Sequence, residues 1–554
     1  WVNQGDPVDF SMLTYLYQAR LRRDQAPGTP SEEFSQINYF LGAYEKPALA
    51  FRYLEYYLGK NRLDSSMQSF YEKWKFRHPG PSDLRDHLQS DAGTDLGWLF
   101  DGFLYSTGHM DYAIKTVKPG RGDLQVSLSN RGSVESPVLL AGLLHGEVQD
   151  SVWVEGFEGV RTVDFPSGNY DQLVLDHRKL SLEVNRKNNY YRLGSPFPKL
   201  EKIQLRALPG LETAQRTNLF LSPFISWNNY DKTMIGAAIY NPFLPPRQFN
   251  FALAPLYGTG SRQLSGFGHV RWQWYPDIPA LYRISVGTTF RSAQFDNPPG
   301  ENPRYMRLDP KLRIELSRSP TDKFRQQIQW RSIYLRREIP RFESTFVWED
   351  DLIHELSYRA ENRRALNPYS FGLALERQSY DDASGDQHYL KLSLEGSLGW
   401  NYQPGNRVHV RLFGGFFLDN TRRDAANIAP GAFSLAYRGR DDYRFDGYYL
   451  GRNDADNIWS QQVTHQDGHM KFIIDPTATD LGRSNNFLLA LNLSADLPIG
   501  LPIRPYFDLG YFDSTRQTAD FGDQLVWSGG IDIRLFNGLI NVYAPLLSSR
   551  NIRD

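Results

Sequence analysis

The chain has 554 residues, with 62 Lys and Arg against 63 Asp and Glu, and it contains no cysteine. The near-zero net charge gives no indication of a nucleic-acid partner, and without cysteine neither disulfides nor thiolate metal sites can form. The sequence has no run of about 18 apolar residues of the kind that forms a transmembrane helix. Its aromatic share of 14% and its 45 glycines are nevertheless typical of a transmembrane barrel, in which only alternate strand residues meet lipid.

Residues 1–115 are predicted to be helical. In YEKPALAFRYLEYYLG the apolar residues recur at helical spacing, and Gly59 is placed to end the helix. Residues 116–207 change to short alternating runs such as DLQVSLSN and KLSLEVN, separated by Gly, Pro and Asn. This pattern predicts a small β-sandwich.

Residues 215–554 are predicted to form a transmembrane antiparallel β-barrel. In YLKLSLEGSLGW the leucines and Trp400 share one face, whereas Lys391 and Glu395 share the other. Strands of roughly 10 residues with this alternation place polar side chains in a lumen and apolar ones in lipid. The connections indicate about 15 strands, the last being LINVYAPLL, and we expect a missing sixteenth to close the barrel. The alternative is a large soluble β-domain.

The helical region resembles the gluzincin zinc metallopeptidases, typified by aminopeptidase N. The resemblance rests on NYFLGAYEKPALAFRYLEYYLG, FYEKWKF and DLGWLFDGFL, and it covers about a hundred residues. It implies that Tyr44 donates a hydrogen bond to the oxyanion of a tetrahedral intermediate, with Tyr39 close by. The family's glycine after the lysine is Pro47 here, which is acceptable only in the first turn of a helix.

The metal site that this resemblance implies is incomplete in the chain. Gln4 in WVNQG occupies the place of the third zinc ligand, where an amide oxygen is a poor substitute for a carboxylate. The motif H-E-x-x-H is absent, and His354-Glu355 lies on a predicted strand, which cannot place two ligands on one face. His465 and His469 are expected to be a solvated loop pair. Zinc is therefore expected only if ligands precede Trp1; the alternative is that WVNQG is an unrelated helix start.

The barrel resembles the outer-membrane assembly and two-partner-secretion superfamily. The longest loop, residues 421–484, contains LAYRGRDDYRF, in which Arg438 and Gly439 match the superfamily's lid signature. The next-but-one strand reads PYFDLG, in which Asp508 and Gly510 match a second signature. The resemblance implies that Arg438 and Asp508 form a charge pair that pins the lid in the lumen; the alternative is that Arg438 is an ordinary loop arginine.

The departures in this second resemblance are Arg440 in place of an aromatic residue and Tyr506 in place of Phe or Gly. The superfamily's periplasmic repeat domains are not visible, and the peptidase-like module stands where they would be. The whole chain is thus expected to be multidomain α + β: a helical peptidase-like module, a small β-sandwich and a barrel of about 16 strands.

Three functions follow as hypotheses. We favour a peptidase-like module without catalytic activity, a pseudoenzyme that binds peptide or partner proteins as an accessory subunit of an outer-membrane complex. The first alternative is a membrane-tethered zinc aminopeptidase whose H-E-x-x-H lies upstream of Trp1, in which zinc would activate a water. The second alternative is protein translocation or outer-membrane insertion through the barrel, since fold alone does not settle function.

The expected location is the outer membrane of a Gram-negative bacterium. An even strand count would put both barrel ends in the periplasm, so the helical module and sandwich are expected there too. The expected partners are the lipid bilayer and possible polypeptide substrates or other outer-membrane proteins, with no nucleic acid.

Overall fold

A computed structural model describes residues 10–207, 209–299, 301–317, 319, 322–341, 345–382, 385–424, 428–454, 457–473, 481–513 and 524–553. The chain divides into two compact units. The first, which we call the helical–sandwich unit, comprises Trp1–Leu221 and Asn241–Arg247. The second, the barrel unit, comprises Ser222–Tyr240 and Gln248–Asp554.

Helices occupy the first part of the helical–sandwich unit. Pro47 is the second residue of α3, which continues directly from the π-helical segment Leu41–Glu45, and Gly59 (φ 86°) separates α3 from α4. The buried face of α3 includes Tyr53 and Leu54, which are 0% exposed. The α-helices are α1 (Phe10–Arg20), α2 (Gln36–Phe40), α3 (Lys46–Leu58), α4 (Lys60–Trp74), α5 (Pro81–Ala92) and, at the end of the barrel unit, α6 (Arg550–Arg553). Two π-helical segments are Leu41–Glu45 and Trp98–Leu104, and the 3-10 turns are Ser31–Glu33, Arg186–Asn188, Gly439–Asp441, Ile458–Ser460 and Phe536–Gly538.

A β-sandwich completes this unit. One sheet has the order β1-β2-β5 and the other β4-β3-β6-β7. A single apolar core joins the sheets to the helices, because Tyr53 and Trp98 cluster with Val126 and Leu140. The strands are β1 (Tyr112–Pro119), β2 (Asp123–Asn130), β3 (Val138–Leu144), β4 (Glu147–Val154), β5 (Val160–Pro166), β6 (Gln172–Leu175) and β7 (Tyr190–Arg192).

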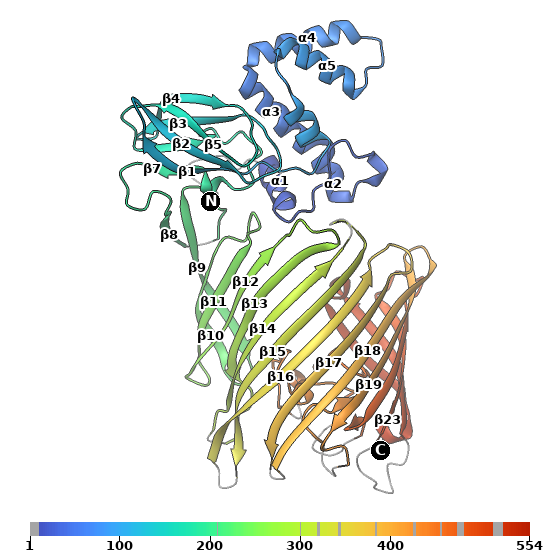
Figure 1. Cartoon of the computed structure of the whole chain (residues 1–554). Helices are drawn as coiled ribbons and strands as arrows, with labels where there is room; N and C mark the ends of the chain where they lie inside the picture. The colour runs from blue at the N-terminus through green and yellow to red at the C-terminus, as the bar shows by residue number, and fades with distance from the viewer. Residues whose placement is uncertain are drawn as a thin grey trace. The chain divides into compact units, whose positions relative to one another are not determined.

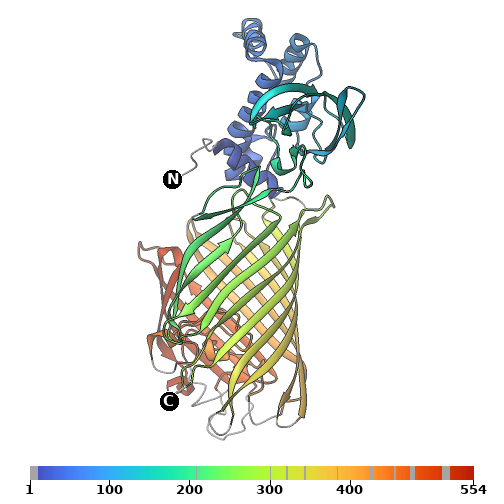
Figure 2. The ribbon, with the colours of Figure 1, turned by 90° about the vertical axis from the view of Figure 1, so that its left-hand side faces the viewer.

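The largest sheet has 16 strands and curves round on itself as a barrel (Figures 1 and 2). Its order is β25-β24-β23-β22-β19 and then β18 down to β8. Successive strands pair antiparallel from β10 to β25, whereas β8 pairs parallel with β9. The strands are β8 (Lys202–Ala207), β9 (Arg216–Asn228), β10 (Lys232–Tyr240), β11 (Phe249–Gly258), β12 (Leu264–Trp274), β13 (Leu281–Gln294), β14 (Arg304–Leu316), β15 (Phe324–Arg341), β16 (Thr345–Asn362), β17 (Tyr369–Asp382), β18 (Gly385–Gln403), β19 (Asn406–Asn420), β22 (Phe487–Ala495), β23 (Ile503–Phe512), β24 (Leu525–Leu535) and β25 (Ile540–Ser548).

The prediction of a β-barrel is therefore confirmed, with one difference in the strand count. We expected the sixteenth strand after the last predicted one, which is β25. In the structure the sixteenth strand is β8, at the other edge of the sheet, and it comes from a segment that we assigned to the sandwich. Its apolar residues alternate too briefly to distinguish a barrel strand from a sandwich strand.

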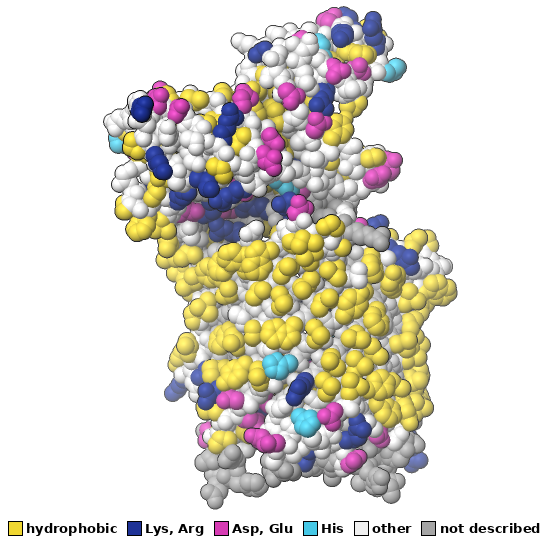
Figure 3. Space-filling model, in the orientation of Figure 1, with side chains coloured by type: hydrophobic (Ala, Val, Ile, Leu, Met, Phe, Trp, Pro, Cys, Tyr) yellow, Lys and Arg dark blue, Asp and Glu magenta, His cyan; other side chains and the backbone are white. Residues whose placement is uncertain are grey.

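The two faces of the barrel sheet differ as the alternation predicts. On β18, Leu398 and Trp400 point outward and are 43% and 55% exposed, whereas Lys391 points inward and is 4% exposed. Apolar side chains cover the outer surface of the barrel unit in a broad belt (Figure 3). A belt of this kind matches the hydrocarbon region of a bilayer.

Among the described residues, no helix has the length and apolar character needed to cross a membrane.

Candidate functional site

The described part of the chain between β19 and β22 lies inside the barrel, where it contacts inward-facing residues of several strands, among them Arg307 on β14, Glu376 on β17 and Asp508 on β23. We call residues 421–486 the lid. Counted from β9, it joins the eleventh strand to the twelfth. Its described part includes the two-residue strands β20 (Phe433–Ser434) and β21 (Arg483–Ser484), which pair with each other.

Arg444 of the lid binds two carboxylates of the barrel wall. Its Nη1 lies 3.0 Å from Oε2 of Glu355 on β16 and 3.0 Å from Oε2 of Glu376 on β17. The Glu376 side chain is 3% exposed and also accepts hydrogen bonds from the hydroxyls of Tyr443 and Tyr389. Charge-assisted hydrogen bonds of this kind fix orientation as well as distance.

Asp446 forms the complementary contact with wall cations. Its carboxylate lies 2.8 Å from Nη1 of Arg331 on β15 and 2.5 Å from Nη2 of Arg307 on β14. Arg291 on β13 donates a hydrogen bond to the carbonyl oxygen of Gly447 at 3.0 Å. The lid therefore supplies a cation to wall carboxylates and a carboxylate to wall arginines. Few of these buried charges are left without a partner of opposite sign.

Lys391 on β18 is a wall cation that also contacts the lid. Its Nζ donates to the carbonyl oxygen of Gly431 at 2.7 Å and lies 3.4 Å from Oε1 of Glu376. The same ammonium lies 4.8 Å from the ring centroids of Phe433 and of Tyr443. Cation–π attraction is strongest where water is excluded, as it is here.

The predicted residues Arg438 and Asp508 take other partners. Asp508 on β23 is 0% exposed and lies 2.6 Å from Nζ of Lys471, near the far end of the lid. Arg438 donates from Nη2 to the carbonyl oxygen of Asp454 at 3.2 Å, and its amide donates to Asp441. Asp508 thus takes its cation from the lid, and that cation is Lys471, not Arg438.

The predicted glycines Gly439 and Gly510 lie where an added Cβ would collide with neighbouring lid atoms. A Cβ at residue 439 would lie 2.7 Å from the carbonyl oxygen of Arg452 and 2.9 Å from its Cα. A Cβ at residue 510, on β23, would lie 2.7 Å from Cδ1 of Leu435, a lid residue that is 0% exposed. Both glycines therefore allow a close approach, the first within the lid and the second between lid and wall.

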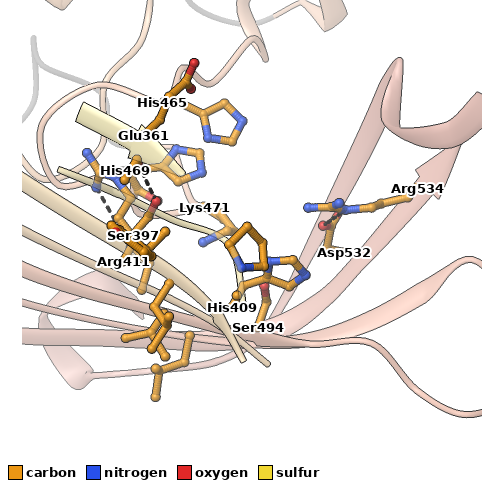
Figure 4. A pocket seen from close by; sticks show the side chains of 18 of the residues that line it. Glu361, Ser397, His409, Arg411, His465, His469, Lys471, Ser494, Asp532 and Arg534 are labelled. Carbon is orange, nitrogen blue, oxygen red and sulfur yellow. Dashed lines mark hydrogen bonds and ion pairs between the residues drawn. The ribbon is translucent and has the colours of Figure 1, made fainter. Parts of the chain in front are cut away.

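A cavity of about 340 Å³ remains in the lumen beside the lid. Figure 4 shows His409, His465, His469 and Lys471 around it. The rings of His465 and His469 stack with centroids 3.8 Å apart. His469 is 4% exposed whereas His465 is exposed, so our expectation of a solvated pair is wrong for His469, which the lid carries into the lumen.

Tyr39 and Tyr44 lie at the surface of the helical–sandwich unit. Tyr44 stands on the π-helical segment Leu41–Glu45 and is 59% exposed, and Tyr39 on α2 is 46% exposed. The Tyr44 ring centroid lies 6.5 Å from that of Tyr39 and 6.1 Å from that of Phe40. Among the described residues, none forms a hydrogen bond with the Tyr44 hydroxyl. Single π-helical turns occur often at functional sites.

Directly after Tyr44, the chain buries a charged group. Lys46 is 0% exposed and its Nζ lies 3.3 Å from Oδ2 of Asp24, while Nε2 of His109 lies 3.2 Å from Oδ1. Burial acts to raise the pKa of Asp24, but the hydrogen bond and charge of His109, together with Lys46, hold that pKa below its ordinary value. Burial lowers the pKa of Lys46 despite the attraction of Asp24. This cluster fixes the start of α3 beneath the exposed tyrosines.

The metal ligands that we considered are not brought together in the described part of the chain. Gln4 lies outside the described residues. Within them, no three His, Asp or Glu side chains are grouped so as to hold a metal ion. His354 and Glu355 lie on β16, as the sequence indicated, and Glu355 binds Arg331 and Arg444.

Sequence analysis did not predict the network between lid and wall. Its signal was present as charged residues at inward positions of four adjacent strands, Arg331, Glu355, Glu376 and Lys391. Cross-strand neighbours of opposite charge are expected to pair, but the lid's contribution of Arg444 and Asp446 could not be placed without the loop's path.

Comparisons with known proteins find likenesses among solved structures. No protein-family model matches the chain, and no curated protein matches it. CdiB from Acinetobacter baumannii is 12% identical, with a TM-score of 0.29, and the match covers 62% of this chain and 62% of CdiB. BamA from Haemophilus ducreyi lacking POTRA domains 1-3 is 10% identical, with a TM-score of 0.32, and the match covers 61% of this chain and 68% of that one. The P pilus usher PapC translocation pore is 9% identical, with a TM-score of 0.14.

Proposed function

We propose that the chain is an outer-membrane β-barrel protein whose lumen is held closed by the lid. The supporting observation is the set of ion pairs between lid and wall, in which Arg444 and Asp446 engage β14, β15, β16 and β17. The apolar belt on the outer face supports a membrane location. A plugged lumen passes solutes only when the plug moves, so the lid is the regulated element of the barrel.

Conductance in planar bilayers tests this proposal. The wild-type protein should give few and small current steps, because the lid and its side chains fill the lumen. A variant in which residues 430–482 are replaced by a short Gly/Ser linker should give large, steady steps. Equal conductance of the two proteins would contradict a lid that closes the barrel.

The helical–sandwich unit is proposed to bind polypeptide without cutting it. Support comes from the exposed ring group of Tyr39, Phe40 and Tyr44 and from the resemblance of this region to gluzincin peptidases. Gln4 in place of a carboxylate ligand favours a pseudoenzyme over an active aminopeptidase. A peptide-binding role would make this protein an accessory subunit of an outer-membrane complex.

Two measurements on the full-length protein separate binding from catalysis. We expect peptides to protect Tyr44 from chemical modification, and Tyr44→Phe to bind peptide several-fold more weakly. We also expect less than one zinc in ten molecules and no hydrolysis of aminoacyl substrates. Stoichiometric zinc with turnover would favour the zinc aminopeptidase instead.

Passage of a client polypeptide through the barrel is a second candidate. It is favoured by the polar character of the contacts of Arg444 and Asp446, since water can replace ion pairs when the lid moves. A client arrested midway should cross-link to inward positions such as Lys391. Cross-links confined to the helical–sandwich unit would favour binding alone.

The helical–sandwich unit is proposed to lie in the periplasm. The connection between β10 and β11 is short, whereas the lid enters from the other end of the barrel, and short turns are typical of the periplasmic side. Protease added to intact cells should leave this unit whole. Its removal while the membrane stays sealed would contradict the assignment.

A further inference from the structure

The segment that leads into the barrel exposes four large apolar side chains. Phe197 is 66% exposed, Leu200 64%, Ile203 72% and Leu205 62%. Isolated exposed apolar residues are common, but four within nine positions are a cluster of the kind that marks an interaction site. All four precede β9, and the last two belong to β8.

The register of β8 places two of these residues on the outward face of the barrel sheet. In the parallel pair, Ile203 is level with Thr217 and Leu205 with Leu219. Registered neighbours in a sheet point to the same side, and alternate residues of one strand share a face. Ile225 lies farther along β9 on the same face as Leu219, and it is 68% exposed. The apolar face of β8 therefore continues the outward apolar face of β9.

The charges of this segment are unequal. Glu201 is its one acid, and that carboxylate is already bound by Lys187 and by the Thr217 hydroxyl. Lys202 is exposed, and Lys199 is exposed and lies near Arg131 and Lys115. The surplus is positive, and positive charge beside an apolar face is typical of segments at an anionic lipid surface.

We propose that β8 is a lipid-contacting strand: Ile203 and Leu205 enter the bilayer beside β9, and Lys199 binds the anionic headgroups. The occupant of this face is the lipid leaflet rather than a protein, because the face is continuous with the outward apolar face of β9 and has the basic Lys199 at its entry. This inference rests on the proposed membrane location of the barrel.

Because the chain has no cysteine, single cysteines carrying an NBD fluorophore can report each position in proteoliposomes that contain brominated lipid. Ile203→Cys and Leu205→Cys test the apolar face, and Gln204→Cys tests the opposite face. Ile225→Cys on the barrel is the positive control, and Val160→Cys on β5, where the native residue is 58% exposed, is the negative control.

We expect quenching at positions 203 and 205 to be at least half of that at 225, and quenching at 204 to equal that at 160. Quenching at 203 and 205 no greater than at 160, with position 225 fully quenched, would overturn the inference and leave the barrel's membrane location standing. No quenching at 225 would overturn both.

The headgroup contact has its own measurement. Removing phosphatidylglycerol from the vesicles should lower quenching at 203 about twofold, and Lys199→Gln should give the same loss in the presence of that lipid. A signal at 203 that depends on neither change would overturn the role of Lys199.

Discussion

Replacement of Arg444 by methionine should release the lid. Methionine keeps much of the side-chain volume but leaves the carboxylates of Glu355 and Glu376 without this partner. Removing one member of a buried ion pair costs about 3–5 kcal/mol. Glu355 keeps Arg331 at 2.9 Å and Glu376 keeps Lys391 at 3.4 Å, so the lower end of that range applies. About 3 kcal/mol corresponds to roughly a hundredfold increase in undocked lid.

The rate at which a buried lid cysteine reacts measures this population. Ser434 is 3% exposed, and Ser434→Cys introduces the chain's single thiol with little change in volume. In the docked state a water-soluble maleimide should react slowly, and Arg444→Met should accelerate the reaction by roughly two orders of magnitude.

Arg336→Met is the matched control for this experiment. Arg336 pairs with Asp350 at 3.6 Å, but the two side chains are 41% and 52% exposed, so the pair is solvated. Its loss should change the labelling rate less than threefold, since exposed pairs contribute about 0–1 kcal/mol. An Arg444→Met rate within threefold of the wild type would refute the reasoning that ion pairs hold the lid.

Two further predictions concern a glycine and a buried acid. Gly439→Ala should weaken lid docking by about 1–3 kcal/mol, because its Cβ would meet the main chain of Arg452. The maleimide reaction of Ser434→Cys measures this effect. An unchanged labelling rate would show that the turn at Gly439 has room for a methyl group. Burial, with the charge of Asp111, raises the pKa of Glu183 well above its ordinary value. Since the folded pKa exceeds the unfolded one, the stability from Glu183 is present below about pH 4.5 and is lost as the pH rises through the folded pKa. Urea unfolding of the full chain, followed by Trp fluorescence, should show Glu183→Gln gaining on wild type by up to about 1.4 kcal/mol per pH unit over that range; a gap that narrows with rising pH would contradict the sign.

The sequence predicted the barrel well because its signal is periodic. Each strand must place polar residues in the lumen and apolar residues in lipid, so Lys391 and Trp400 show their sides without any tertiary information. β8 was assigned to the sandwich because it is too short for this periodic signal: six residues do not show whether their apolar face meets a core or lipid.

The lid contacts could be predicted only in outline. The residues Gly439 and Gly510 were singled out from a resemblance, and the structure gives each a steric reason in a close approach. The choice of Lys471 over Arg438 for Asp508 depends on how the lid turns inside the lumen. That path is set by long-range contacts, which local sequence patterns do not encode.

Disulfide formation between the lid and the wall tests the central claim most directly. A Cβ at residue 510 would lie 3.1 Å from Cγ of Leu435, whose place the Sγ of a cysteine at residue 435 takes, so the two thiols can approach to the roughly 2.05 Å of an S–S bond. The variant Leu435→Cys with Gly510→Cys, in membranes, should oxidise almost completely to the cross-linked form and resist maleimide. Two cysteines that stay reduced and react rapidly with maleimide would show that the lid does not occupy the barrel lumen.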